Sequence, residues 1–400
     1  MATTTLSVIA QALKTDYLDI LTKFVNEQSG PFMAKIEKGN HTMNNKDAFT
    51  WFMQYGSHSG IKNIAETGEF GAAAPRSYKQ ASLEVINFTG PIEISHKTMK
   101  VTKNKARSVV DQLTAQMKDL TTDYRFHLRR QLFGKTTGQI ALTGVTSNSA
   151  TIQLADGTNM NKFRRGMVID VLDSTDSWAE LVANSTIIGI DRPNLTIEIG
   201  TAITTEVGDM VVIEDSYGIE MTGLEDILTK DSTIYGIDRS SATYSFLNPV
   251  LKELDPATTV DMNIEDLDAM VDEIEELYGE QIDYIHGQRG PVGNFVKALR
   301  RYNVNIDTQT FDAGRKIVKY GGIDIVKEPL AASNALDFYT TSDFKLAHVG
   351  NKMYDWLDEG EGVLHPVSNK PVYRAFLIGY MNLLCMKPSA QGRISAVNNY

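Results

Sequence analysis

The longest helical pattern in the chain runs from Lys97 to Phe133 without a proline or a glycine. Its apolar positions stand three or four residues apart, which is the spacing of a helix with one buried face. They are Val109, Leu113, Met117, Leu120, Tyr124, Leu128 and Leu132. At about 1.5 Å per residue such a helix would be roughly 55 Å long. A rod of this length is unusual in a globular domain and restricts the folds that the chain can adopt.

The rod carries many cations near both of its ends. They are Lys97, Lys100, Lys103, Lys105 and Arg107 at the start, and Arg125, Arg129 and Arg130 near the end. Charges of this kind usually lie on a solvated helix face. The alternative is that they meet acidic groups of a neighbouring subunit or of a nucleic acid. The sequence leaves both interpretations open.

A glycine-rich stretch, from Gly56 to Ser95, precedes the rod. Its front half has too few large apolar residues to anchor a core, and a loop of this length is usually functional or disordered. The part from Ser82 onward is β-rich. Its apolar alternation changes phase between Val85 and Ile86, which predicts a β-bulge. We expect a long two-stranded excursion that another subunit stabilises.

Residues 137–216 form a block of short β patterns that turn residues separate. The predicted strands are Ile140 to Leu142, Ala150 to Leu154, Met167 to Leu172, Thr186 to Ile190, Leu195 to Ile199 and Met210 to Glu214. Several short strands at this spacing predict a small barrel or sandwich. Helical and mixed patterns lie on both sides, so the block has the character of an insertion.

The other segments predict a terminal helix and a mixed α/β unit. Leu6 to Phe24 has the period of an amphipathic helix. Beyond Tyr217 the predicted elements are a helix capped by Asn263, a strand at Ile282 to Ile285, a helix near Val292 to Arg301, a hairpin from Lys316 to Lys327 and a long strand from Pro371 to Lys387. Between Asp261 and Glu280 stand nine acids and no lysine or arginine, which is typical of a solvated face.

The motifs that would indicate chemistry are incomplete. Gly56 to Gly60 resembles a nucleophile elbow but has His58 where a serine is required. Asp170, Asp173 and Asp176 lack the alternating ligands and central glycine of a calcium loop, so solvated turn acids are expected there. We expect no catalytic, cofactor-binding or metal-binding residues.

Charge and cysteine content narrow the function classes further. A net charge of −11 argues against wrapping of nucleic acid by the whole surface, although a container that meets its contents on one face is compatible with it. No apolar run approaches the ~18 residues of a membrane span. Cys385 is the only cysteine, so it cannot form an intramolecular disulfide, and its apolar neighbours predict a small core residue.

An ordered set of segments carries a family resemblance. The set is Ala65-Glu66-Thr67-Gly68-Glu69, Ile94-Ser95-His96-Lys97, the long helix, Met221-Thr222-Gly223-Leu224, Gly236-Ile237-Asp238-Arg239, Ile264 to Asp268, Tyr284 to Gly287 and Lys319 to Ile323. In this order the chain resembles the major capsid proteins of tailed bacteriophages, whose Hong Kong phage type of fold is shared with herpesvirus shells. The resemblance covers nearly the whole chain apart from 137–216.

The resemblance implies an α+β capsid fold with five parts. They are an N-terminal arm and helix (1–55), an extended β loop (56–96), a peripheral domain with a spine helix (97–136 and 349–400), an inserted β-barrel-like domain (137–216) and an axial domain (217–348). In this arrangement Lys97 to Phe133 is the spine helix, and the β loop lies across a neighbouring subunit.

The resemblance also implies a structural protein, not an enzyme, without a cofactor. Its subunits would self-assemble into hexamers and pentamers of an icosahedral head that encloses double-stranded DNA through non-specific contacts. The head would assemble in the bacterial host cytoplasm and become the virion capsid, with a scaffolding protein, a portal and a decoration protein as further partners and no membrane. Contacts between subunits are expected at Glu66, Glu69, Arg76, Tyr78, Lys79, Lys97, Lys100, Arg107, Arg125 and Arg129.

Two other functions stay open. An encapsulin, the shell protein of a bacterial nanocompartment, has the same fold, although the chain length and the insertion count against it. A soluble enzyme or a glycan-binding protein would also explain the β-rich block. The founding relative cross-links lysine to asparagine between subunits, and Lys62, Lys79 and Asn369 are available here, but no local pattern supports that chemistry.

Overall fold

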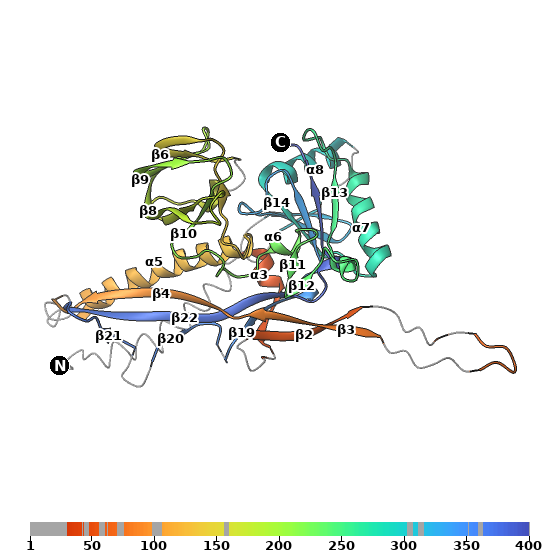
Figure 1. Ribbon diagram of the computed structural model, residues 1–400, viewed down its shortest axis with the longest axis horizontal. Helices are drawn as coiled ribbons and strands as arrows, with labels where there is room; N and C mark the ends of the chain where they lie inside the picture. Colours follow the sequence, from red (N-terminus) through yellow and green to blue (C-terminus); the bar gives the residue numbers. More distant parts are fainter. Residues whose placement is uncertain are drawn as a thin grey trace.

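The computed structural model describes most of the chain. The described residues are 30–41, 43, 48–55, 61, 63–69, 76–97, 106–155, 160–301, 307–310, 316–350, 352–358 and 363–399. They form an elongated platform from which two β-rich units rise side by side (Figure 1). The predicted helix from Leu6 to Phe24 lies outside the described residues.

The platform is a mixed sheet with α5 (Ala106–Leu132) lying along it (Figure 1). Its central strand, β22 (Val372–Cys385), pairs antiparallel with β4 (Ile86–Ser95) over the whole length of β4. The other members are β1 (Glu37–Asn40), β19 (Phe344–His348), β20 (Asp355–Trp356) and β21 (His365–Pro366), and α3 (Pro31–Lys35) precedes β1. The predicted last strand and the burial of Cys385 are confirmed.

The helix α5 lies within the predicted range, and residues 98–105 fall outside the described residues. Where side chains are described, Met117, Tyr124, Leu128 and Leu132 of the predicted apolar face are buried. The Tyr124 ring lies 4.2 Å from the Phe88 ring, and its hydroxyl donates to the Phe88 carbonyl at 3.2 Å. The strand β4 thus supplies part of the apolar surface against which this helix packs.

A hairpin of β2 (Ala48–Tyr55) and β3 (Ser77–Glu84) continues the line of the platform (Figure 1). Only Val85 separates β3 from β4, at the position where the sequence predicts a β-bulge. The predicted bulge is wrong. The chain instead changes its strand partner at Val85, because β3 pairs with β2 and β4 pairs with β22, and the alternation of apolar side chains begins anew in β4. The excursion therefore includes β2, which the expected range 56–96 leaves out, and excludes β4.

The insertion is a six-stranded sheet in the order β5-β10-β7-β8-β9-β6. Its elements are β5 (Ala141–Leu142), β6 (Ser147–Gln153), η3 (Met160–Lys162), β7 (Val168–Leu172), β8 (Glu180–Asp191), β9 (Thr196–Thr205) and β10 (Met210–Ile213). A bridge between Thr143 and Leu154 joins the two ends of this order, and the Ala155 N–H donates to the Leu142 carbonyl at 2.8 Å. All six predicted strands are present, and the closing bridge gives the unit a barrel-like form.

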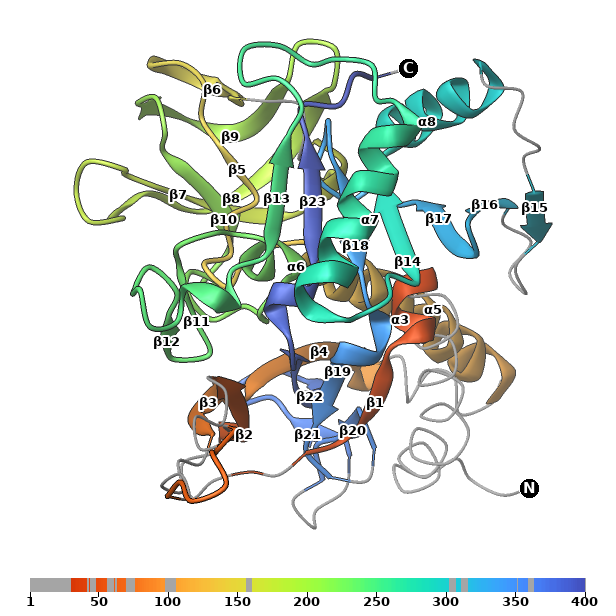
Figure 2. The ribbon, with the colours of Figure 1, turned by 90° about the vertical axis from the view of Figure 1, so that its right-hand side faces the viewer.

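The other unit is a seven-stranded sheet in the order β13-β23-β18-β14-β17-β16-β15, on which α7 and α8 pack (Figure 2). The bounds are β13 (Val250–Glu253), α7 (Ile264–Tyr278), β14 (Tyr284–Gly287), α8 (Arg289–Arg301), β15 (Asp307–Thr310), β16 (Lys316–Tyr320), β17 (Ile323–Lys327), β18 (Leu336–Tyr339) and β23 (Gly392–Ser395). The predicted hairpin, both helices and the N-cap at Asn263 are confirmed.

Two strands cross the boundary that the sequence places at residue 349. β19 was expected with the axial unit but pairs with β22 in the platform, whereas β23 was expected in the platform but pairs with β13 and β18. The chain crosses between the units at η5 (Thr341–Asp343) and again at η6 (Pro388–Ala390). The Gln391 amide donates to Asp343 Oδ2 at 3.1 Å, which ties the two crossings together.

A connector of short elements lies between α5 and the axial sheet. It contains α6 (Leu224–Ile227), β11 (Thr233–Ile234), β12 (Ile237–Asp238) and η4 (Ser245–Leu247). Arg239 is fully buried inside it, and its guanidinium donates to the carbonyls of Ile227 and Asp226 at 2.9 Å each. This side chain provides further hydrogen-bond donors to the carbonyl groups of the short elements.

Replacing Gly223 with alanine should destabilise the subunit by about 1–3 kcal/mol. Gly223 precedes α6, and a Cβ there would overlap the carbonyl group of Gly134 at the end of the spine helix, which is backbone and cannot rotate away. Urea unfolding measures the loss. Gly200→Ala is the matched control, because its Cβ would meet only the tip of Ile188 at 3.8 Å. Equal stabilities of the two variants would contradict this contact.

Candidate assembly surfaces

The two faces of the β2–β3 hairpin differ in burial. Phe49, Trp51 and Met53 point to the buried face, whereas Phe52 and Tyr78 on the opposite face are 70% and 59% exposed. At the base of the hairpin, the Trp51 ring lies 4.8 Å from the Tyr235 ring. The subunit thus holds one face of the hairpin and leaves two large rings of the other face in solvent, which is an arrangement typical of a binding surface.

The predicted contact residues of the loop lie on or beyond this hairpin. Glu66, Glu69 and Arg76 are exposed, and so is the apolar side chain of Ile61. Lys79 is half-buried, because its ammonium group lies 5.5 Å from the centre of the Tyr244 ring in the connector. Because Glu66, Glu69 and Arg76 are exposed, a neighbouring subunit could reach them, and their role in a contact stays a prediction.

The predicted contact residues of the spine helix differ in their exposure and in their partners. Lys97 is exposed, and Lys100 and the side chain of Arg107 lie outside what the structure describes. Arg125 is half-buried, and burial together with the nearby Arg129 charge lowers its pKa. Arg129 donates to both oxygens of Glu328 at 2.6 and 2.8 Å within the same subunit, and its role in a contact with a neighbour stays a prediction. Its guanidinium therefore joins the helix to the axial unit.

Buried ion pairs join the spine helix, the connector and the axial sheet, and the sequence does not predict them. Arg130 and Glu220 are 3% and 2% exposed and form a two-pronged ion pair, with one contact at 3.0 Å. Arg393 of β23 donates to both oxygens of Glu225 at 2.6 and 2.7 Å, and to Asp337 at 2.5 and 3.0 Å. Each pair joins segments far apart in the sequence, so no local spacing reveals it.

The charge of Arg393 dominates the electrostatics of its cluster. Burial alone would raise the pKa of Asp337, but Arg393 outweighs it and holds that pKa at about 2. The pKa of Glu225 is likewise lowered, because Arg393 offsets the effect of burial. The pKa of Arg393 itself lies well above its usual value, since both carboxylates oppose the effect of burial. All three groups are therefore ionised near neutral pH and hold the axial sheet to the connector.

The acidic residues of the insertion have structural partners. Asp170, Glu180 and Asp215 bring carboxylate oxygens within 4.8 Å of one another, and the predicted neighbours Asp173 and Asp176 do not join them. The oxygens of Asp170 accept the N–H groups of Asn184 and Asp215 at 2.8 Å each, so this carboxylate ties strand ends together.

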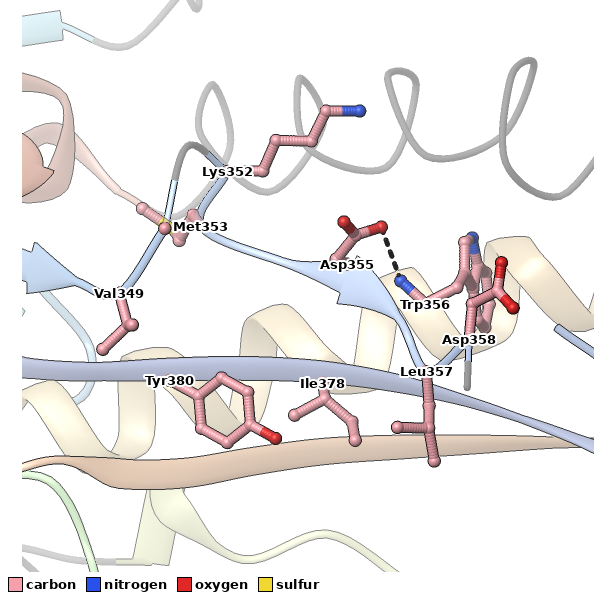
Figure 3. A pocket seen from close by; sticks show the side chains of 10 residues that line it. Val349, Lys352, Met353, Asp355, Trp356, Leu357, Asp358, Ile378 and Tyr380 are labelled. Carbon is pink, nitrogen blue, oxygen red and sulfur yellow. Dashed lines mark hydrogen bonds between the residues drawn. The ribbon is translucent and has the colours of Figure 1, made fainter. Parts of the chain in front are cut away.

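A cavity of about 490 Å³ lies beside β22 on the platform (Figure 3). Its lining includes Lys352, Asp355, Asp358 and Tyr380, with apolar side chains around them. Asp355 accepts the N–H of Trp356 at 2.9 Å. Among the residues that the structure describes, the lining contains no cysteine, histidine or serine. Among the described residues, no helix is both long and apolar enough to cross a bilayer.

No protein-family model matches the sequence, and no curated protein matches it. Solved structures do match. The cyanophage A-1(L) capsid asymmetric unit contains a chain that aligns with a TM-score of 0.54 over 92% of each chain, at 11% sequence identity. The chain has the phage capsid fold. The likeness extends over nearly the whole length, so the fold expected from the ordered segments, and its α+β class, are confirmed.

Other solved structures that match give lower TM-scores. The holo-SrpI encapsulin complex from Synechococcus elongatus gives a TM-score of 0.47 at 7% identity, over 93% of this chain and 89% of that chain. Mycobacterium phage Patience gives 0.46 at 13% identity, over 100% and 92%.

Proposed function

We propose that the chain is the major capsid protein of a tailed bacteriophage, a structural subunit without catalysis of its own. The observation that carries this proposal is the match to the cyanophage capsid chain over 92% of both chains. A match of this extent includes the platform, the hairpin and the axial unit together, and not a single common motif. Function is a matter of sites as well as fold, so the surfaces of the subunit must support the proposal independently.

The exposed apolar surface of the hairpin gives that independent support. Phe52, Ile61 and Tyr78 are 70%, 84% and 59% exposed, and all belong to or follow the hairpin that extends beyond the platform. Large apolar side chains gathered on one extension are costly in a monomer and typical of a surface that a partner covers. In a shell, the neighbouring subunit is that partner.

The proposal includes the assembly expected from the family. Subunits form hexamers and pentamers of an icosahedral head around double-stranded DNA, which they meet through non-specific contacts. A scaffolding protein, a portal and a decoration protein are further proposed partners. The head assembles in the cytoplasm of the bacterial host and becomes the virion capsid.

Electron microscopy of the purified protein, alone and after co-expression with its genomic neighbours, tests the proposal. We expect closed shells, or rings of five and six subunits. A protein that stays monomeric at high concentration under all assembly conditions would contradict the proposal. Small uniform shells that hold an enzyme and no DNA would favour the encapsulin function instead.

Replacing Phe52 and Tyr78 together with serine should abolish shell formation and leave the subunit folded. Both rings are exposed, so the free energy of unfolding should change by no more than about 0.5 kcal/mol per site. Sedimentation measures assembly and urea unfolding measures stability. Ile188→Ser, on an exposed insertion residue, is the control that should still assemble. Shells at the wild-type yield would exclude this face from the contact.

A further inference from the structure

A basic groove runs along α8 in the axial unit. The cavity has a volume of about 830 Å³. Its charged lining comprises Arg289, Lys297, Arg300 and Arg301 of α8 and Lys327 at the end of β17. The intervals of eight and three between Arg289, Lys297 and Arg300 place these three cations along one side of α8. The groove therefore concentrates positive charge in a concave site.

The charge of this groove is only partly neutralised within the subunit. Asp261 accepts from both Lys297 and Arg301, at 3.0 and 3.4 Å. Among the residues that the structure describes, no carboxylate oxygen lies within 4 Å of the side-chain nitrogens of Arg289, Arg300 or Lys327. These three side chains are exposed. Such a groove attracts a negatively charged partner, and the field of the groove favours an extended acidic surface over a single ion.

The neighbouring helix, α7, presents such an acidic surface. Its apolar side, with Leu267, Met270 and Ile274, is buried against the axial sheet. The opposite side carries the exposed carboxylates Glu265, Asp272, Glu273, Glu275 and Glu276. Among the described residues no cation within 4 Å is recorded for any of the five. The acids of α7 that do have partners, Asp266 and Asp268, contact Lys252 and Tyr320 instead.

We propose that the α8 groove of one subunit binds the α7 acidic face of a second copy of the chain within each ring. This inference rests on the proposed function and names the surfaces that ring formation uses. A ring requires two different, complementary surfaces on every subunit, and the neighbouring helices α7 and α8 of the axial unit carry them here. Figure 2 shows the two helices on the axial sheet. Opposite charges on the two surfaces set the partner and the register of the contact.

DNA is the competing occupant of a basic groove, but the surroundings disfavour it. The helix α7 packs beside α8, and its five exposed carboxylates repel phosphate. The chain as a whole has a net charge of −11. The same carboxylates match the groove of a neighbouring subunit. The second copy is therefore the partner that the observed charges favour.

Charge reversal on either surface tests the proposal. Arg300→Glu with Lys327→Glu reverses two of the five groove cations, and Asp272→Lys with Glu276→Lys reverses two of the five acids of the α7 face. All four residues are exposed, so each variant should fold, and circular dichroism checks this. Each variant alone should form rings or shells at least about tenfold less than wild type, because two like-charged residues then face the unaltered surface of the neighbour at every contact. The fourfold variant restores opposite charges at the reversed positions and should recover assembly. Arg165→Glu with Arg192→Glu, an equal charge change on exposed insertion residues, should leave assembly unchanged.

A mixture of the two double variants gives the sharpest result. Every contact between the two variants joins either two reversed surfaces or two unaltered ones, so a ring with an even number of subunits can alternate the variants without a mismatch. A pentamer cannot, because five subunits leave one contact between two copies of the same variant. We therefore expect hexamers from the mixture but few closed shells, and mass photometry together with electron microscopy distinguishes the two.

The outcomes separate this inference from the proposed function. If wild type forms shells and both double variants do so equally well, only the inference falls. It also falls if the fourfold variant fails to recover while the Arg300→Glu, Lys327→Glu variant loses binding to a duplex DNA probe, since the groove then serves DNA. If wild type never forms rings or shells, the proposed function and the inference fall together.

Discussion

Replacing Arg393 with methionine is expected to lower the free energy of unfolding by about 3–5 kcal/mol. The guanidinium makes two hydrogen bonds to Glu225 and two to Asp337, and the side chain is only 14% exposed. Methionine fills much of the volume but leaves two buried carboxylates without their cation. Urea unfolding of the purified subunit measures the loss. The unfolding free energy of Arg393→Lys should lie between those of wild type and Arg393→Met, because lysine keeps the charge but cannot bridge both carboxylates in this geometry.

A matched variant shows whether burial causes this effect. Arg374 pairs with Glu93 at 2.8 Å on the surface, with side chains 36% and 48% exposed. Arg374→Met should therefore cost no more than about 1 kcal/mol, because solvent screens the pair. Equal losses at the two sites would contradict the importance of the buried cluster.

The effect of Arg393 should also depend on pH. In the folded protein the pKa of Asp337 is about 2, below its usual 3.8, so its contribution to stability is present above pH 3.8 and is lost as the pH falls through 2. Arg393→Met removes this contribution. In the variant, burial without the Arg393 charge raises the pKa of Asp337 above its usual value. The difference in unfolding free energy between wild type and variant should therefore shrink steadily as the pH falls from neutral, and this decline should begin above pH 3.8.

Local patterns in the sequence predict the elements of this fold well. The spine helix, the hairpin of β16 and β17 and the six strands of the insertion all follow from periodicity and turn residues within short windows. Their signals are local because each element is amphipathic in its own right. The order of such elements was also sufficient to indicate the capsid fold, although no single motif was specific.

Contacts between distant segments account for what the sequence did not predict. β23 joins β13 and β18, and β19 joins β22, so the two units exchange strands across the expected boundary. The Arg130–Glu220 and Arg129–Glu328 pairs connect residues that are 90 and 199 positions apart. No local pattern in the sequence reveals that Arg129 pairs with Glu328. No local pattern reveals either that the chain changes its strand partner at Val85, from β2 to β22.

The hairpin base explains why its extension can be removed without unfolding the subunit. Tyr55 pairs with Ser77 at the far end of the β2–β3 ladder. At the near end, the Ser82 N–H donates to the Tyr235 carbonyl at 3.0 Å, and the buried Asn382 amide donates to the Glu84 carbonyl at 2.8 Å. These anchoring contacts lie on the strands themselves, so we expect that the residues between 55 and 77 can be exchanged for a tight turn.

Replacing residues 56–76 with Asn-Gly is expected to abolish shell formation while the subunit stays folded. Asn-Gly favours the two-residue turn that matches the twist of an antiparallel hairpin, so the Tyr55–Ser77 pair should be kept. The variant loses the extension with Ile61, Glu66 and Glu69, which a neighbour would cover. Sedimentation should show subunits only, with an unfolding midpoint no lower than that of wild type. A Gly/Ser linker of the original length should also fail to assemble, because the side chains and not the length make the contact. Wild-type shells from either variant would exclude the extension from assembly, and unfolding of the Asn-Gly variant would mean that the extension belongs to the core of its own subunit.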